Sequence, residues 1–429
     1  MIRVRVAQAA TTQMPRMGAG DPSPDPLPPV SLAERLARLG GPPRQRPLAP
    51  PTPEPPRGFD SVETPYGVAL LRQEVMSLPR LDPHPGSVAY IDTETTGLSG
   101  GTGTYVFAAA VARPIDCGLR LAQLFLPQPG MEPAFLFALQ KELEPAQGIA
   151  SFNGASFDLP ILRTRWVMAR MKGDLAHPPH IDLLTLVRSL YRHRMESCTL
   201  RAVEERLLGY ERDDPVSGVL APEAYFQYLH GCSSPLLEMT LEHNRLDVVS
   251  LVHLHSLLLR RLQGADIAAM DAADWLALGR HRFRRGARAD GWRALRNAAG
   301  FRQGDAAATA GLWISRRLVR RGSIAAADEL LERLEEAFAG DIGIALARAR
   351  LLEWRLRDPH RALSVVEAAQ RRLPEAAADL EARRERLRGK VLRRDGGRHR
   401  RKRDRGQGWF EVALPDEAAE RFDGAGVEP

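Results

Sequence analysis

The pattern of apolar residues changes once along this 429-residue chain, near residue 265, and the change decides what each part can fold into. Before that point, short apolar runs alternate with amphipathic stretches, which predicts an α/β fold with a mixed sheet. Two strands, at 88–91 and 104–111, are expected on either side of a Gly-rich turn at 99–103. Further strands are expected at 119–126, 148–152 and 180–184, and helices at 132–144, 155–171, 199–208, 222–230 and 236–262.

After residue 265 the strand signals stop, and helices are expected in pairs, at 273–285/290–299, 308–321/324–337 and 343–357/360–373. The second helices each carry a small residue, at Ala294, Ala326 and Ala362. Their separations of 32 and 36 residues are close to the ~34-residue period of tetratricopeptide hairpins. Tryptophans recur less regularly in the first helices, at Trp275, Trp313 and Trp354. The spacing favours an all-α, tetratricopeptide-like repeat domain over 265–378, with a single helical bundle as the alternative.

The two ends of the chain have compositions that disfavour packing. Of the 33 prolines, 14 lie in the first 60 residues, so 1–58 is expected to be a disordered arm, interrupted at most by a short helix at 31–39. Residues 383–405 hold 13 Lys/Arg against 3 Asp/Glu, in a chain of net charge +7. The segment 379–429 is therefore expected to be a basic, mostly disordered tail, either a solubility feature or a contact for nucleic acid.

Composition also excludes several classes of protein. The chain is 44% hydrophobic and 26% charged, which is typical of globular domains. Its longest apolar runs fall short of the ~18 residues that a membrane span needs, and the N-terminus has no apolar signal region. The three cysteines, Cys117, Cys198 and Cys232, show no paired spacing. We therefore expect a cytoplasmic protein without disulfides or zinc.

The strongest chemical signal is the segment Ile91-Asp-Thr-Glu-Thr-Thr-Gly-Leu98. Asp92 and Glu94 lie two residues apart at the end of an apolar strand, so their side chains share a face. Two carboxylates this close repel each other unless a cation neutralises them, and hard divalent cations prefer oxygen ligands. The alternative is an ordinary polar turn at a strand end.

Two further segments supply acids. Asn153-Gly-Ala-Ser-Phe-Asp158 follows an expected strand, and Asp158 falls in the first turn of the next helix, where it would also suit the helix dipole. In the long helix 236–262, His243 and Asp247 are four residues apart and share a face. Carboxylates from three segments would suit a two-metal phosphoryl-transfer site, with His243 as the proton acceptor for the attacking water.

With these motifs in order, the region 60–263 resembles the DEDD superfamily of 3′→5′ exonucleases, which have a ribonuclease H-like fold. Asp92-Thr-Glu94 matches its first motif, Asn153–Asp158 its second, and Asp247 its third. The glycine-rich extension after Leu98 and the helix around Asp247 are more similar to the YprB-type group of bacterial predicted exonucleases. The resemblance implies a mixed five-stranded sheet with its second strand antiparallel, flanked by helices, over 59–264.

The resemblance also implies site residues. Asp92, Glu94, Asp158 and Asp247 would hold two Mg²⁺ or Mn²⁺ ions. The family's catalytic His lies five residues before the last Asp, where this chain has Glu242, and its catalytic Tyr lies four before, where this chain has His243. The spacing is thus of the tyrosine type with a histidine in place. Four residues are candidates for contact with the terminal nucleotide: Thr95, Gly97, Leu98 and Asn153. Simple packing is the alternative for Leu98.

The sequence therefore predicts a metal-dependent 3′→5′ exonuclease acting on single-stranded nucleic acid ends, DNA or RNA. The helical repeats and basic tail would add grip on the substrate or recruit a protein partner. The alternative is a catalytically weak or inactive nuclease-like protein that binds nucleic acid and acts as a scaffold through its repeats.

Overall fold

The computed structural model describes residues 53–77, 81, 86–97, 102–116, 118–171, 179–212, 218–232, 234–265 and 267–404. Four sequence predictions lie wholly or partly outside these ranges: most of the proline-rich arm with its short helix, residues 405–429 of the basic tail, Leu98, and residues 99–101 of the Gly-rich turn. Among the described residues no helix is long and apolar enough to cross a membrane.

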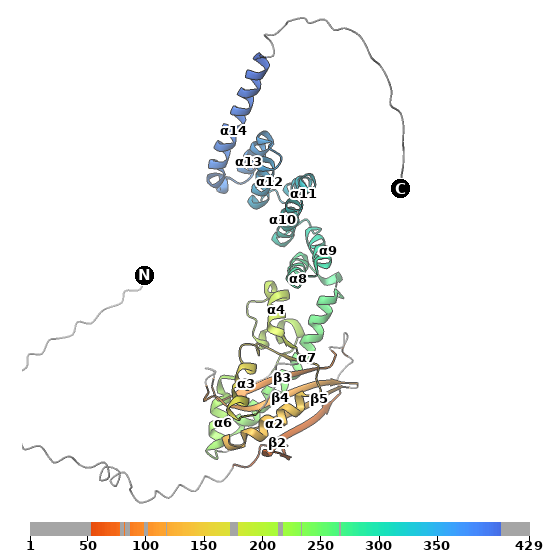
Figure 1. Cartoon of the computed structure of the whole chain (residues 1–429), viewed down its shortest axis with the longest axis vertical. Helices are drawn as coiled ribbons and strands as arrows, with labels where there is room; N and C mark the ends of the chain where they lie inside the picture. The colour runs from red at the N-terminus through yellow and green to blue at the C-terminus, as the bar shows by residue number, and fades with distance from the viewer. Residues whose placement is uncertain are drawn as a thin grey trace, which may run out of the picture. The chain divides into compact units, whose positions relative to one another are not determined.

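A seven-stranded sheet forms the first domain, in the order β1-β2-β5-β4-β3-β6-β7. Strands β2, β3, β4 and β5 are labelled in Figure 1. The strands are β1 (Asp60–Thr64), β2 (Gly67–Met76), β3 (Val88–Thr95), β4 (Val106–Ile115), β5 (Gly118–Phe125), β6 (Gly148–Ser151) and β7 (His180–Asp182). β6 pairs in parallel with β3 and β7, and the other pairings are antiparallel. The predicted mixed α/β fold is confirmed, and β4 is the antiparallel second strand of the expected five.

The sheet has two more strands than expected, because the hairpin β1–β2 adds to the edge at β5. Its apolar signal is weak: in β2 only Ala69, Leu70 and Leu71 are buried, and both ends of the strand are polar or exposed. Thr64 Oγ1 donates to the carbonyl of Gly67 and closes the turn. Gly67, at φ 108°, adopts a backbone conformation that favours glycine.

Helices cover both faces of the sheet. One core packs α2 (Glu132–Leu143), α3 (Asp158–Met168) and α6 (Ala221–Leu229) on alternate residues of the strands, such as Ala89 and Ile91 of β3. The other core packs α4 (Leu183–Tyr191) and α7 (Pro235–Gln263) on the opposite residues, Val88 and Tyr90. Tyr90 Oη and His255 Nδ1 form a buried hydrogen bond of 2.8 Å, which fastens α7 to β3. The expected strand 180–184 is shorter, because α4 begins at Leu183 with Asp182 as its N-cap.

The described region after residue 267 is helical, as the sequence predicts. The pairs are α8 (Ala272–Arg284) with α9 (Arg288–Ala299), α10 (Asp305–Arg320) with α11 (Ile324–Ala337), and α12 (Ile342–Trp354) with α13 (Pro359–Arg372). Leu200–Val203 (α5) continues into a π-helical turn, Glu204–Leu208, within the expected helix 199–208. Short 3₁₀ turns fill several connections, at Pro129–Met131, Arg192–Arg194, Gly218–Leu220, Ile267–Ala269 and Pro374–Ala376.

Three details of this region differ from expectation. The small buried residue of α11 is Ala327, whereas Ala326 is exposed, so the buried alanines are Ala294, Ala327 and Ala362. Trp354 is 63% exposed, unlike the buried Trp275. Residues 377–404 form the helix α14 (Ala377–Asp404) where a disordered tail was expected. Its basic side chains form ion pairs with acids of α12 and α13. Arg383, Arg386 and Lys390 pair with Glu353, and Arg388 pairs with Glu367.

Candidate metal centre at the end of strand β3

Asp92 and Glu94 lie side by side along β3, where it pairs with β4. Asp92 is opposite Ala110 and Glu94 opposite Ala108, and the register shifts between Glu94 and Thr95. Alternation along a strand places both carboxylates on one face. Glu94 is only 8% exposed, so this strand end concentrates negative charge in a partly buried place.

The loop from β6 to α3 brings the next acid to the same strand. Asp158 is the first residue of α3, and Thr93 Oγ1 of β3 donates a hydrogen bond to its Oδ1. Asn153 adopts a positive φ of 65°. Gly154 is closely surrounded, because a Cβ atom at this position would lie 2.1 Å from Ser151 Oγ and 3.0 Å from Asp158 Oδ2. The Asn-Gly pair of the motif is therefore needed to turn the chain and bring Asp158 against β3.

Helix α7 supplies the remaining residues. Asn244, which is fully buried, donates from Nδ2 to Asp92 Oδ2 at 2.7 Å. Asp247 lies one turn later and is 9% exposed. His243 Nε2 lies 3.7 Å from Asp247 Oδ2. The same stretch of helix thus holds Asp92 and presents both an acid and an imidazole.

The charges of the other three acids act on Asp92. Burial raises the pKa of Asp92 well above its ordinary value, and the charges of Asp247, Asp158 and Glu94 raise it further. Burial also raises the pKa of Asp158 to about 6, although its hydrogen bond with Thr93 opposes this change. Carboxylates that repel in this way bind a divalent cation favourably, because the cation removes the repulsion and replaces lost solvation. The donor set therefore fits Mg²⁺ or Mn²⁺.

A guanidinium partly neutralises this cluster. Arg212 Nη1 donates to Asp247 Oδ1 at 2.6 Å, and its Nη2 bonds Glu204 and Ser250 Oγ. The sequence reasoning missed Arg212 because it lies 35 residues before Asp247 in a connecting segment without a motif.

A buried row of polar groups behind Asp92 was also missed. Asn244 Oδ1 accepts from Gln123 Nε2 at 2.9 Å, and Gln123 Oε1 accepts from Arg72. This row links α7, β5 and β2 to Oδ2 of Asp92. A polar Gln123 within the apolar strand β5 was the available signal, since a buried amide needs partners.

The candidate substrate residues lie at two turns beside the acids. Thr95 Oγ1 donates to the carbonyl of Gly97 at 3.0 Å, which shapes the turn after β3. The backbone N–H of Asn153 donates to Asp182 Oδ1 at 3.0 Å, and that oxygen also caps α4. Asp182 thus has a structural role in holding the β6–α3 loop.

A second acidic group lies elsewhere, at His193, Asp271 and Asp274, whose possible ligand atoms are within 4.8 Å of one another. Its buried member already has cationic partners: Arg194 Nη2 bonds Asp274 Oδ2, and Arg261 Nη1 lies 3.3 Å from it. Hydrogen bonds from His193 and Arg194 lower the pKa of Asp274 to about 2 against the opposing effect of burial. This group forms an ion-pair network whose cations would compete with a metal ion. Among the described residues, however, it is this group, and not the β3 cluster, whose ligand atoms meet that spacing.

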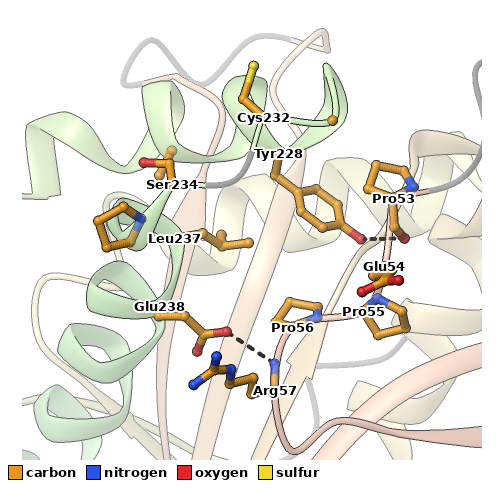
Figure 2. A pocket seen from close by; sticks show the side chains of 13 residues that line it. Pro53, Glu54, Pro55, Pro56, Arg57, Tyr228, Cys232, Ser234, Leu237 and Glu238 are labelled. Carbon is orange, nitrogen blue, oxygen red and sulfur yellow. Dashed lines mark hydrogen bonds between the residues drawn. The ribbon is translucent and has the colours of Figure 1, made fainter.

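A hollow of about 740 Å³ lies between Pro53–Arg57, α6 and the start of α7 (Figure 2). Tyr228 Oη donates to the carbonyl of Pro53, and the backbone N–H of Arg57 donates to Glu238 Oε1. None of its lining residues belongs to the carboxylate cluster. It is a packing feature of the N-terminal segment on α6 and α7.

Residues 89–259 match the family model of the RNase_H superfamily. The domain has an RNase H-like fold. A protein of Bacillus subtilis (strain 168), named as the uncharacterized protein YprB, is 36% identical over 167 residues. That match covers 39% of this chain and 40% of the relative, so the chain spans less than half of the relative's length. A solved family B DNA polymerase from the archaeon Pyrobaculum calidifontis is similar over 50% of this chain and 34% of its own, at 16% identity and a TM-score of 0.33.

Proposed function

We propose that this protein is a divalent-metal-dependent nuclease that removes nucleotides from the 3′ end of single-stranded nucleic acid. The observation that supports the proposal is the electrostatic environment of Asp92, whose pKa is raised by burial and then by the charges of Asp247, Asp158 and Glu94, from α7, α3 and β3. The superfamily match over the same residues supports nuclease-type chemistry. The 3′→5′ direction is what the resemblance of the three motifs to those of the DEDD exonucleases implies.

Each residue of the site has a distinct proposed role. Asp92, Glu94, Asp158 and Asp247 would hold two Mg²⁺ or Mn²⁺ ions, which supply a more nucleophilic water and charge stabilisation for the leaving oxygen. His243, with Nε2 3.7 Å from Asp247 Oδ2, would accept the proton of the attacking water. Asn244 holds Asp92 in place through Oδ2.

Thr95, Gly97, Leu98 and Asn153 would border the terminal nucleotide. Thr95 is the last residue of β3, and Asn153 lies in the turn after β6. The use of cysteine, with Cys198 and Cys232 unpaired, supports a cytoplasmic location.

The direct test is a substrate panel. Single- and double-stranded DNA and RNA oligonucleotides, labelled at the 5′ end, are incubated with the full chain and Mn²⁺ or Mg²⁺. We expect a ladder of products that shorten from the 3′ end of single strands, and loss of activity in Asp92→Ala and Asp158→Asn. The matched control is Asp341→Asn, which changes the N-cap residue of α12. Equal activity of wild type and the Asp92 variant would overturn the site assignment.

One observation favours a second function, that of a catalytically weak scaffold. Arg212 already bonds Asp247 at 2.6 Å, and a guanidinium can replace a cation in an idle nuclease site. Titration with Mn²⁺ in a thermal-unfolding assay separates the two, because a ligand of the native state raises the melting temperature by mass action. A rise at millimolar Mn²⁺ supports the nuclease, whereas no rise supports the scaffold.

A further inference from the structure

Four arginines at the end of α10 form two pairs that face different surroundings: Arg316, Arg317, Arg320 and the C-cap Arg321. Arg317 lies on the Phe283 ring at 4.0 Å, and Arg321 lies on the Trp292 ring at 5.4 Å, so this pair packs against aromatic side chains of the preceding helices. Arg316 and Arg320 are exposed and line a groove on the other side of the helix. The two pairs therefore have different roles.

The groove lies between α10 and α12, the first helices of successive pairs, and has a volume of about 390 Å³. Val319 and Leu351 contribute to its apolar floor. Arg350 and Arg355 complete its cationic rim, and no acidic residue is among its lining residues. Within the described part of the chain, none of the four rim arginines forms an ion pair, although most acids of the neighbouring helices are paired.

Trp354 lies at the same groove and is 63% exposed. The ammonium group of Lys390 lies 4.2 Å from the centre of its ring, and most of the indole surface remains accessible. The groove thus places a large exposed aromatic ring beside guanidinium groups that are not neutralised by acids. This is the combination that binds single strands, in which cations contact phosphates and an aromatic ring stacks on a base.

We propose that this groove is a second binding site for single-stranded nucleic acid, outside the nuclease domain. Arg316, Arg320, Arg350 and Arg355 contact the phosphates, and Trp354 stacks on a base. The proposal takes its ligand class from the proposed nuclease function. It concerns binding rather than cleavage, so it is tested without catalysis.

The test measures the affinity of the full chain for fluorescent oligo(dT) and oligo(U) by anisotropy, in EDTA, at several salt concentrations. We expect Trp354→Ala to weaken binding about tenfold, with partial recovery in Trp354→Phe. We expect Arg316→Ala/Arg320→Ala to weaken binding and to reduce the slope of log affinity against log salt by about 1.4, from about 0.7 for each phosphate contact.

The matched control is Arg293→Ala/Arg333→Ala, which removes two exposed arginines that lie outside this groove. Equal affinities of the groove and control variants would overturn the proposal. It would also be overturned if a poly-glutamate peptide bound more tightly than the oligonucleotide and lost this binding in Trp354→Ala. If the wild type binds through the groove but cleaves nothing, the nuclease proposal fails alone. If it cleaves while the groove variants bind normally, the groove proposal fails alone.

Discussion

Asp158 illustrates how burial acts on a single acid of this site. The residue is 9% exposed and lies near the charge of Asp182. The pKa of Asp158 in the fold, about 6, lies above its ordinary value of 3.8. The folded state therefore binds more protons than the unfolded state between these two values. Its contribution to stability is present below pH 3.8 and is lost as the pH rises through 6.

This shift predicts the pH dependence of the metal-free protein. In EDTA, Asp158→Asn should be increasingly stabilised relative to wild type as the pH rises from about 4 to 7, because the variant avoids a buried negative charge. Thermal unfolding at each pH measures the difference. Millimolar Mn²⁺ should reverse it, since the wild type alone keeps this ligand. A difference that stays constant with pH in EDTA would contradict the assigned environment.

Asn244 is expected to affect both the stability of the fold and, indirectly through Asp92, the binding of metal. It joins Gln123 to Asp92 and is fully buried. Asn244→Ala should cost about 1–3 kcal/mol of unfolding free energy, because it leaves the amide of Gln123 without one of its partners. It should also weaken Mn²⁺ binding by releasing Asp92. Denaturant unfolding measures the first effect, with the exposed Asn297→Ala in α9 as the control.

At the scale of elements, much of the fold could be predicted from apolar periodicity. The runs at 88–91 and 148–152 became β3 and β6, because buried parallel strands are continuously apolar. The hairpin β1–β2 could not be predicted, since only three of its consecutive residues are buried. For the site, the acids could be predicted from short motifs, whereas Arg212 and Gln123 could not, because their contacts span more than 30 residues of sequence.

Helix α14 lies where a disordered tail was predicted from charge composition alone. A run of cations was expected to be solvated, but acids on the preceding helices neutralise its first turns. The side chain of Glu353 is fully buried and binds Arg383, Arg386 and Lys390. These hydrogen bonds lower the pKa of Glu353 against the effect of burial. The sequence of α12 alone gives no indication of these distant partners.

Glu353→Gln should therefore release α14 from the helices it packs on. Removing one partner of a buried ion-pair network costs about 3 kcal/mol, because the three cations lose their common acid. Limited trypsin digestion should cut the variant within 383–394 much faster than wild type. Glu367→Gln, which removes a more exposed partner of Arg388, should change the rate little. Equal digestion of both variants would show that apolar packing alone holds α14.

At the scale of the whole molecule, the sheet and the first helical pairs share one core. The cluster that contains Tyr90 and Val248 continues through Trp275 and Ala294 to Ala310. The composition change near residue 265 is thus a change of architecture without a break in packing. Arg261 of α7 and Asp274 of α8 add an ion pair at the same junction. The nuclease-like domain and its helical extension are consequently expected to unfold together.

Calorimetric titration with Mn²⁺ tests most directly whether the β3 cluster binds divalent cations. We expect wild type and His193→Ala, which alters only the second acidic group, to bind two Mn²⁺ ions each. We expect Asp92→Asn to lose this binding. Retention of Mn²⁺ by Asp92→Asn together with its loss in His193→Ala would instead place the metal at the group of Asp271 and Asp274.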